Sequence, residues 1–134
     1  MGRSLVDKLG IRAGDRVYLS NAPQGYVSYL GALPAGAKLV KTLPQSCEFI
    51  HLFVKEQAKL RAAFPKLKKG LAGNGLFWVS WPKGASKVAT DVNENIAREI
   101  GLENGLVDVK VCAVDDIWSG LKFVYRLKDR PTKK

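Results

Sequence analysis

Aromatic and cationic side chains fall in three loop-like segments that could hold an anionic ligand. Trp81 is followed by Lys83 and Lys87, and Trp118 lies three residues after Asp115. An indole can stack on a planar group, and a nearby ammonium can pair with an anion. Large aromatics at loop edges can equally serve to close the core. The candidate ligand-binding residues are Asn21, Gln24, Gly25, Tyr26, Trp81, Lys83, Ser86, Lys87, Asp115, Trp118 and Ser119.

The side chains used most often in catalysis are sparse, and we assign no catalytic residue. His51 is the only histidine and lies within an apolar run, which favours a buried position with its hydrogen bonds satisfied. Asp115 and Asp116 are adjacent in a turn, so they cannot share work as a carboxylate pair, and Asp115 more plausibly accepts from backbone amides. Cys47 and Cys112 lack a CxxC partner or a neighbouring histidine, so we expect reduced thiols and no metal site.

Alternating apolar segments define the elements that must position these residues. Ser4 is expected to cap a first short helix, and Asp91 with Glu94 resembles a capping box. Pro65 must kink its helix or begin a second piece, and the glycines of segment 70–75 are expected to end it. The predicted strands are 16–20, 38–41, 48–54, 76–81, 107–114 and 121–127, and the predicted helices are 5–9, 26–30, 56–70 and 90–104.

This order predicts one α/β domain spanning residues 1–134, with residues 128–134 as a disordered basic tail. A strand–helix–strand succession gives parallel neighbours, and the short turn before the last strand makes it antiparallel. In such a sheet, ligands bind beyond the carboxyl ends of the strands. Those ends carry segments 21–26, 55–56, 81–87 and 115–120, which we therefore expect along one edge.

Charge and hydropathy narrow the partners. The 134 residues carry 22 Lys and Arg against 12 Asp and Glu, a net charge of +10 that favours anionic partners. No apolar run approaches the roughly 20 residues needed to span a bilayer, so we expect a soluble cytoplasmic protein with no membrane partner. The basic run before the fourth strand is most simply a solvated helix face, but it could bind nucleic acid. Its candidate residues are Lys55, Lys59, Arg61, Lys66, Lys68 and Lys69.

Two features expected of a nucleotide site are missing. A dinucleotide loop needs several glycines so that the backbone can approach a pyrophosphate, whereas NAPQGY at 21–26 has one. The glycine-rich segment 70–75 follows a helix and precedes a strand, which is the wrong context for a phosphate loop. The second strand ends at Lys41, where an acid would usually contact the ribose hydroxyls.

Several segments resemble known proteins. LFWVSWPKGAS and GLVDVKVCAVDDIWSGLKFV, with NAPQGY and FIHLFV, resemble a family of short uncharacterised bacterial proteins that has no assigned activity. More loosely, LGIRAGDRVYL, the passage 68–79 and the closing hairpin resemble class I S-adenosylmethionine-dependent methyltransferases. That resemblance implies a three-layer Rossmann-like open sheet, shortened between its second and fourth strands, with the methyl-donor site altered.

The sequence thus supports three functions. The first is a non-catalytic module that binds an anionic small molecule at the carboxyl edge without a cofactor. The second is a divergent methyltransferase, which alone would use S-adenosylmethionine. The third is a basic accessory protein that binds nucleic acid through the cationic helix face.

Overall fold

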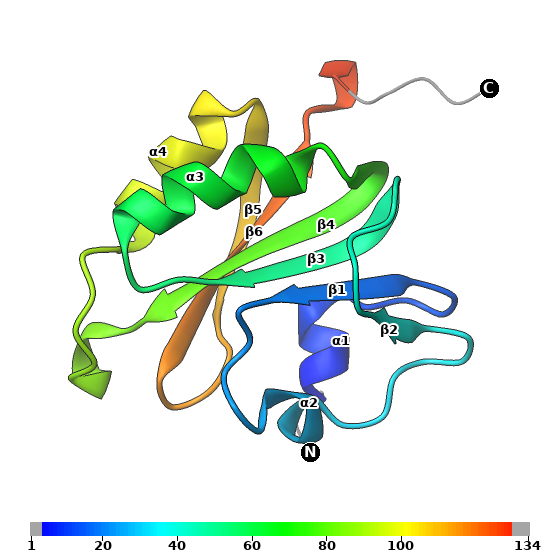
Figure 1. Cartoon of the computed structure of the whole chain (residues 1–134), viewed down its shortest axis with the longest axis horizontal. Helices are drawn as coiled ribbons and strands as arrows, with labels where there is room; N and C mark the ends of the chain where they lie inside the picture. Colours follow the sequence, from blue (N-terminus) through cyan, green and yellow to red (C-terminus); the bar gives the residue numbers. More distant parts are fainter. Residues whose placement is uncertain (1–3, 130–134) are drawn as a thin grey trace.

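The computed structural model describes residues 4–129 and contains one six-stranded sheet (Figure 1). The first three neighbouring pairs are parallel, and the last two are antiparallel. The expected mostly parallel sheet with an antiparallel final strand is therefore confirmed. Its strands are β1 (Arg16–Ser20), β2 (Lys38–Val40), β3 (Cys47–Phe53), β4 (Leu71–Pro82), β5 (Leu106–Ala113) and β6 (Trp118–Tyr125), in the order β2-β1-β3-β4-β6-β5.

Helices cover both faces of the sheet and give three layers (Figure 1). The short helices α1 (Leu5–Leu9) and α2 (Tyr26–Leu30) lie on one face, and α3 (Gln57–Lys68) and α4 (Glu94–Glu103) lie on the other. Each face has its own apolar core, one around Trp78 and one around Phe77, because alternate strand residues point to opposite faces. Short 3₁₀ turns occupy Gly84–Ser86 and Leu127–Asp129.

The strand β4 begins five residues earlier than the predicted strand 76–81, at Leu71. The helix ends at Lys68 and Gly70 lies in the turn after it, as expected, but Gly73 and Gly75 lie within β4 and do not belong to the helix stop. A Cβ at Gly75 would lie 3.0 Å from the carbonyl oxygens of Ala72 and Cys47, so the backbones approach too closely for a side chain. The register of β3 and β4 shifts here, between Cys47 and Phe49. Gly75 therefore serves this irregular strand pairing.

The helix predicted at 90–104 begins later, at Glu94, and Asn93 is its cap, with its side chain accepting from the amide of Ile96 at 2.9 Å. The predicted Asp91–Glu94 capping box is wrong. Asp91 instead accepts from the amide of Gln57 at 2.8 Å and so satisfies the first turn of α3. The first turns of α3 and α4 both have amides without an intrahelical partner, and the carboxylate of Asp91 bonds to α3, which is distant in sequence.

Three further local features test the sequence reading. The expected cap at Ser4 is confirmed, because its hydroxyl accepts from the amide of Asp7. The helix α3 runs through Pro65 without a second piece. Trp118 and Gly120 belong to β6 and not to the turn before it, whereas Asp115 does accept from the amides of residues 117 and 118, as expected.

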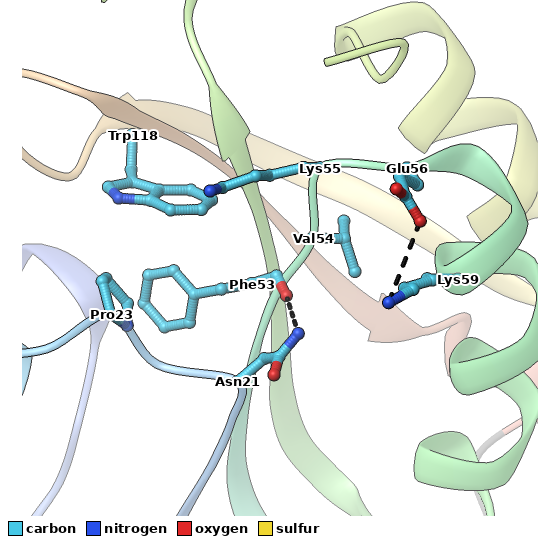
Figure 2. A pocket seen from close by; sticks show the side chains of 8 residues that line it. All are labelled: Asn21, Pro23, Phe53, Val54, Lys55, Glu56, Lys59 and Trp118. Carbon is cyan, nitrogen blue, oxygen red and sulfur yellow. Dashed lines mark hydrogen bonds and ion pairs between the residues drawn. The ribbon is translucent and has the colours of Figure 1, made fainter. Parts of the chain in front are cut away.

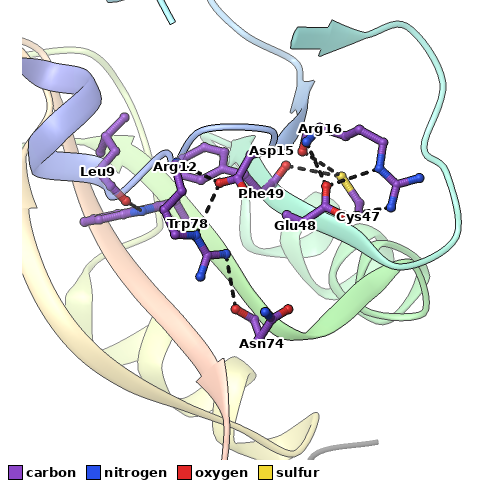
Figure 3. Close-up of polar contacts among 9 residues, drawn as sticks. All are labelled: Leu9, Arg12, Asp15, Arg16, Cys47, Glu48, Phe49, Asn74 and Trp78. Carbon is purple, nitrogen blue, oxygen red and sulfur yellow. Dashed lines mark hydrogen bonds and ion pairs between the residues drawn. The ribbon is translucent and has the colours of Figure 1, made fainter. Parts of the chain in front are cut away.

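The edge where the parallel strands begin, here called the amino edge, is held by charged side chains (Figure 3). Arg16 donates from its backbone amide and guanidinium to both carboxylate oxygens of Glu48, at 2.7–3.1 Å. The buried carboxylate of Asp15 accepts from the amide of Arg12, whose guanidinium also donates to the carbonyl of Asn74. These contacts fasten the loop before β1 to β3 and β4.

Two expectations concern the ends of the chain and the membrane. Lys128 and Asp129, at the start of the predicted disordered tail, lie in the 3₁₀ turn, and residues 130–134 of that prediction lie outside the described residues. Among residues 4–129, every helix is too short or too polar to cross a bilayer.

Candidate functional site

A crevice lies at the point in the sheet where the order of successive strands reverses. From β1 the chain passes outward to β2 and then returns to place β3 on the other side of β1. The loops after β1 and β3 therefore leave in opposite directions, which is where open α/β sheets bind ligands. We call this cavity of about 310 Å³ the switch-point crevice. Its lining residues are Asn21, Pro23, Phe53, Val54, Lys55, Glu56, Lys59 and Trp118.

Two aromatic rings form one wall of the crevice (Figure 2). The rings of Phe53 and Trp118 meet edge to face, with centroids 5.2 Å apart and an interplanar angle of 87°. Phe53 also contacts Tyr26 edge to face and stacks on His51 at 4.1 Å. Both residues are largely buried, Phe53 at 1% and Trp118 at 7% exposure, so the packed rings form a preorganised apolar lining of the crevice.

The opposite side of the crevice is polar. Asn21 adopts a left-handed backbone conformation, with φ at 65°, and its amide donates to the carbonyl of Phe53 at 3.3 Å. This bond joins the loop after β1 to the end of β3. Figure 2 shows the side chain of Lys55 extending toward Trp118, and among the described residues its ammonium has no ion pair or hydrogen bond. Lys59 lies 3.9 Å from Glu56, an exposed and therefore weak pair.

The backbone of Lys55 is held by the segment that precedes α4. Its carbonyl accepts from the hydroxyl of Thr90 at 2.6 Å and from the amide of Asp91 at 3.2 Å. The amide of Val54 donates to the carbonyl of Ser80 on β4. The turn after β3 is therefore fixed from two sides while the lysine side chain remains exposed.

Behind the aromatic wall lies a buried polar group. His51 is fully buried, with Nε2 2.7 Å from the hydroxyl of Ser80 and Nδ1 3.3 Å from that of Tyr26. Burial lowers the pKa of His51 to about 3, so the imidazole is neutral. Burial and the charge of Asp115 raise the pKa of Tyr26. The satisfied interior histidine expected from the sequence is confirmed.

The structure brings only part of the predicted site together. Asn21 and Trp118 line the switch-point crevice, whereas Tyr26 is buried behind it, beside His51. Gln24 and Gly25 are exposed in the same loop but do not line the cavity.

The remaining predicted residues lie on the carboxyl edge outside the crevice. Trp81 is 5% exposed and packs in the core beneath α3 and α4, on the opposite face of the sheet from Trp118. Ser86 bonds to the backbone of its own turn, to the carbonyl of Lys83 and the amide of Val88. The others, Lys87, Asp115 and Ser119, belong to the turns and strand ends nearby.

Sequence reasoning missed four residues that line the crevice, namely Pro23, Phe53, Val54 and Glu56. A usable signal existed, since β3 ends at the aromatic Phe53, and only Val54 separates it from Lys55. A buried run that ends in an aromatic and then a lysine places both at the carboxyl edge.

The cationic helix face is partly occupied by internal contacts. Arg61 pairs with Glu103 at 3.2 Å, and Lys68 donates to the carbonyl of Asn104 and lies over the ring of Tyr125. Lys66 and Lys69 are exposed on α3 or just after it. Within residues 4–129, no group of three or more histidine, cysteine or acidic side chains is placed to hold a metal ion.

Comparison with known proteins defines the fold but not the activity. No protein-family model and no curated protein matches this chain, so its resemblance to the short uncharacterised bacterial family stays a prediction. The structure is similar to a SAM-dependent methyltransferase from Aquifex aeolicus, with 14% identity, a TM-score of 0.62, and coverage of 89% of this chain and 86% of that one. It is also similar to precorrin-6y C5,15-methyltransferase from Geobacter metallireducens, at 9% identity and a TM-score of 0.63, covering 91% and 86%.

A third similar structure is fibrillarin from Aeropyrum pernix with bound S-adenosyl-L-methionine, at 13% identity and a TM-score of 0.61, covering 87% of this chain and 69% of that one. The chain therefore has the Rossmann-like fold of class I methyltransferases, as the resemblance implied. Identities this low carry the fold alone.

Proposed function

We propose that this protein is a non-catalytic binding domain that holds a small planar anion in the switch-point crevice. The observation that carries the proposal is the placement of Lys55 beside the aromatic wall of Phe53 and Trp118, since its ammonium has no partner in the part of the chain that the structure describes. A planar group can pack on the ring edges while its negative charge meets the ammonium. A cavity of about 310 Å³ lies at the small end of the range for ligand sites, which favours a compact molecule.

The binding of matched ligand pairs tests this proposal. Benzoate and AMP carry the charge that benzamide and adenosine lack, so calorimetric titration should show that one or both anions bind more tightly than their neutral counterparts. Lys55→Ala should weaken that binding about fivefold or more, since a charge-assisted contact is worth about 1–3 kcal/mol. Lys66→Ala removes a similar exposed charge outside the crevice and should change nothing. Equal losses of affinity in the two variants would show that net charge alone weakens binding, and would contradict a site at Lys55.

A divergent methyltransferase is the second candidate, favoured by the strand order and by the similar solved structures. The residues present fit S-adenosylmethionine poorly. The loop after β1 offers one glycine and a proline, and an exposed Lys41 stands after β2, where an ammonium cannot accept hydrogen bonds from ribose hydroxyls as an acid would. Titration with S-adenosylmethionine decides this candidate, and the absence of heat and of a thermal shift at millimolar concentration would exclude it.

Nucleic-acid binding is the third candidate, supported by the exposed Lys66 and Lys69 and by the net charge of +10. If these residues contact phosphates, affinity for single-stranded nucleic acid should fall steeply with salt. Binding that is absent, or independent of salt, would remove this candidate.

A further inference from the structure

A second cavity lies on the other side of the loop that follows β1. It has a volume of about 440 Å³ and opens between α2 and the ends of β1 and β2. We call it the β2 groove, and its lining residues are Leu19, Ala22, Val27, Leu39, Val40 and Lys41. Alternate residues of one loop serve the two cavities, since Asn21 and Pro23 line the switch-point crevice and Ala22 lines the groove.

The β2 groove remains open because the sheet ends there. β2 has three residues and is an edge strand, and α2 is too short to cover it. Leu39 pairs with Val17 and points to the face that carries α2. As a result Leu39 is 40% exposed and Val27 is 50% exposed, although both are aliphatic. Exposed apolar side chains around a concavity are typical of a binding groove.

One charge stands at this apolar groove. Lys41 is exposed, and among the described residues its ammonium makes no ion pair or hydrogen bond. The other five lining side chains are aliphatic and offer no hydrogen-bonding group, so they cannot read a base or a sugar. The groove thus combines an aliphatic body site with a single cationic group.

We propose that the β2 groove binds an aliphatic carboxylate, with its hydrocarbon chain along Leu19, Val27 and Leu39 and its carboxylate paired with Lys41. Burial of the chain supplies affinity in proportion to the apolar area removed from water, and the ammonium selects the charged head group. This site is separate from the switch-point crevice, so the proposal does not depend on whether the crevice binds a ligand.

Octanoate is the probe, and octanol is the uncharged match of the same chain length. Calorimetry should show octanoate binding more tightly than octanol, and amide chemical shifts should move at the groove residues. Lys41→Gln should weaken octanoate about fivefold while leaving octanol unchanged, which also shows that the groove is intact. Lys38→Gln removes an exposed charge from the same strand outside the groove and is the matched control.

Two further variants locate the site. Val27→Glu places a negative charge in the groove and should weaken octanoate at least tenfold, and the half-exposed position tolerates the change without loss of the fold. Lys55→Ala should leave octanoate binding unchanged, because that residue lines the other cavity.

Several results would overturn the proposal. They are no octanoate binding at millimolar concentration, equal octanoate affinity of the Lys41→Gln variant and the parent, and shifts that map to the switch-point crevice. A concentration-dependent dimer that Val27→Glu dissociates, without octanoate binding, would show that a second copy covers the groove instead.

Discussion

The two edges of the sheet use charge in opposite ways. At the amino edge, Arg16 and Glu48 satisfy each other at 2.9 Å, and the carboxylate of Asp15 is buried and bonded to the amide of Arg12 (Figure 3). At the carboxyl edge, Lys55 extends its ammonium into a crevice, and within residues 4–129 it makes no ion pair or hydrogen bond (Figure 2). The charges at the amino edge hold the fold together, whereas the ammonium of Lys55 at the carboxyl edge remains available to a ligand.

This difference shows which polar residues serve folding and which remain for a partner. A paired charge at the amino edge fastens loops whose backbone would otherwise lack contacts, so its removal should appear in stability. An unpaired lysine costs little to replace in the free protein, so its removal should appear in binding. Stability and binding measurements on matched variants can therefore test whether the two edges differ in this way.

The largest expected effect is a loss of stability when Trp78 is replaced, compared with the same substitution at Trp118. The indole of Trp78 is fully buried and donates to the carbonyl of Leu9 at 2.8 Å, which attaches α1 to the sheet (Figure 3). Trp78→Phe should lower the free energy of unfolding by about 2–3 kcal/mol, through lost packing and an unpaired carbonyl. Trp118→Phe, at the open edge, should lower it by about 1 kcal/mol. Equal losses in urea denaturation would contradict the distinction.

The next effect concerns pH, and it comes from His51, which lies between the two edges. Burial lowers the pKa of His51 to about 3 in the folded protein, against about 6.5 in the unfolded chain, so the unfolded state takes up a proton first. Stability should therefore fall by about 1.4 kcal/mol per pH unit as the pH drops below 6.5, until the folded pKa is reached. His51→Gln keeps a polar side chain and should remove this slope in urea titrations at pH 7, 6 and 5. An unchanged slope would assign it to other groups.

Most of the fold follows from the sequence because its signals are local. Each predicted strand and helix is present, and the carboxyl ends of all strands but the antiparallel β6 share one edge, as the succession of elements implies. The failures lie where long-range contacts override local preference. Asp91 caps α3 and not its own helix, and Gly75 fits a close approach of two backbones that a helix-stop pattern cannot reveal.

The candidate site was only partly predictable, because topology gives the edge but not the face. Trp81 and Trp118 looked equivalent as aromatics at strand ends, yet their side chains lie on opposite faces of the sheet. Both tryptophans are buried, but Trp81 packs under α3 and α4, whereas Trp118 packs on the other face, where it also lines the crevice. The pairing of Pro82 with Trp118 sets this difference, since the residue before Pro82 must point the other way. That register is a property of the folded sheet.

A smaller effect tests the amino edge directly. Hydrogen bonds from Arg16 lower the pKa of Glu48, so this carboxylate stabilises the fold above its unfolded pKa and loses that contribution as the pH falls through its lower folded pKa. Glu48→Gln should lower the free energy of unfolding by about 1 kcal/mol at pH 7, a modest value because both side chains are partly exposed. The loss should shrink at more acidic pH, as the pH falls through the lowered pKa of Glu48 and the parent carboxylate takes up a proton. A constant loss at all pH values would point to packing and not to charge.

The smallest expected effect on stability comes from replacing the exposed lysines Lys55 and Lys41. Lys55→Ala and Lys41→Gln each remove an exposed ammonium that has no ion pair or hydrogen bond among residues 4–129, so each should change the free energy of unfolding by less than about 0.5 kcal/mol. The same urea series used for Glu48→Gln provides the measurement, with Lys66→Ala as the reference for an exposed lysine elsewhere. A loss near 1 kcal/mol in either variant would mean that the lysine supports the folded state. The two edges would then no longer differ in kind, and the case for a ligand at that lysine would lose its physical basis.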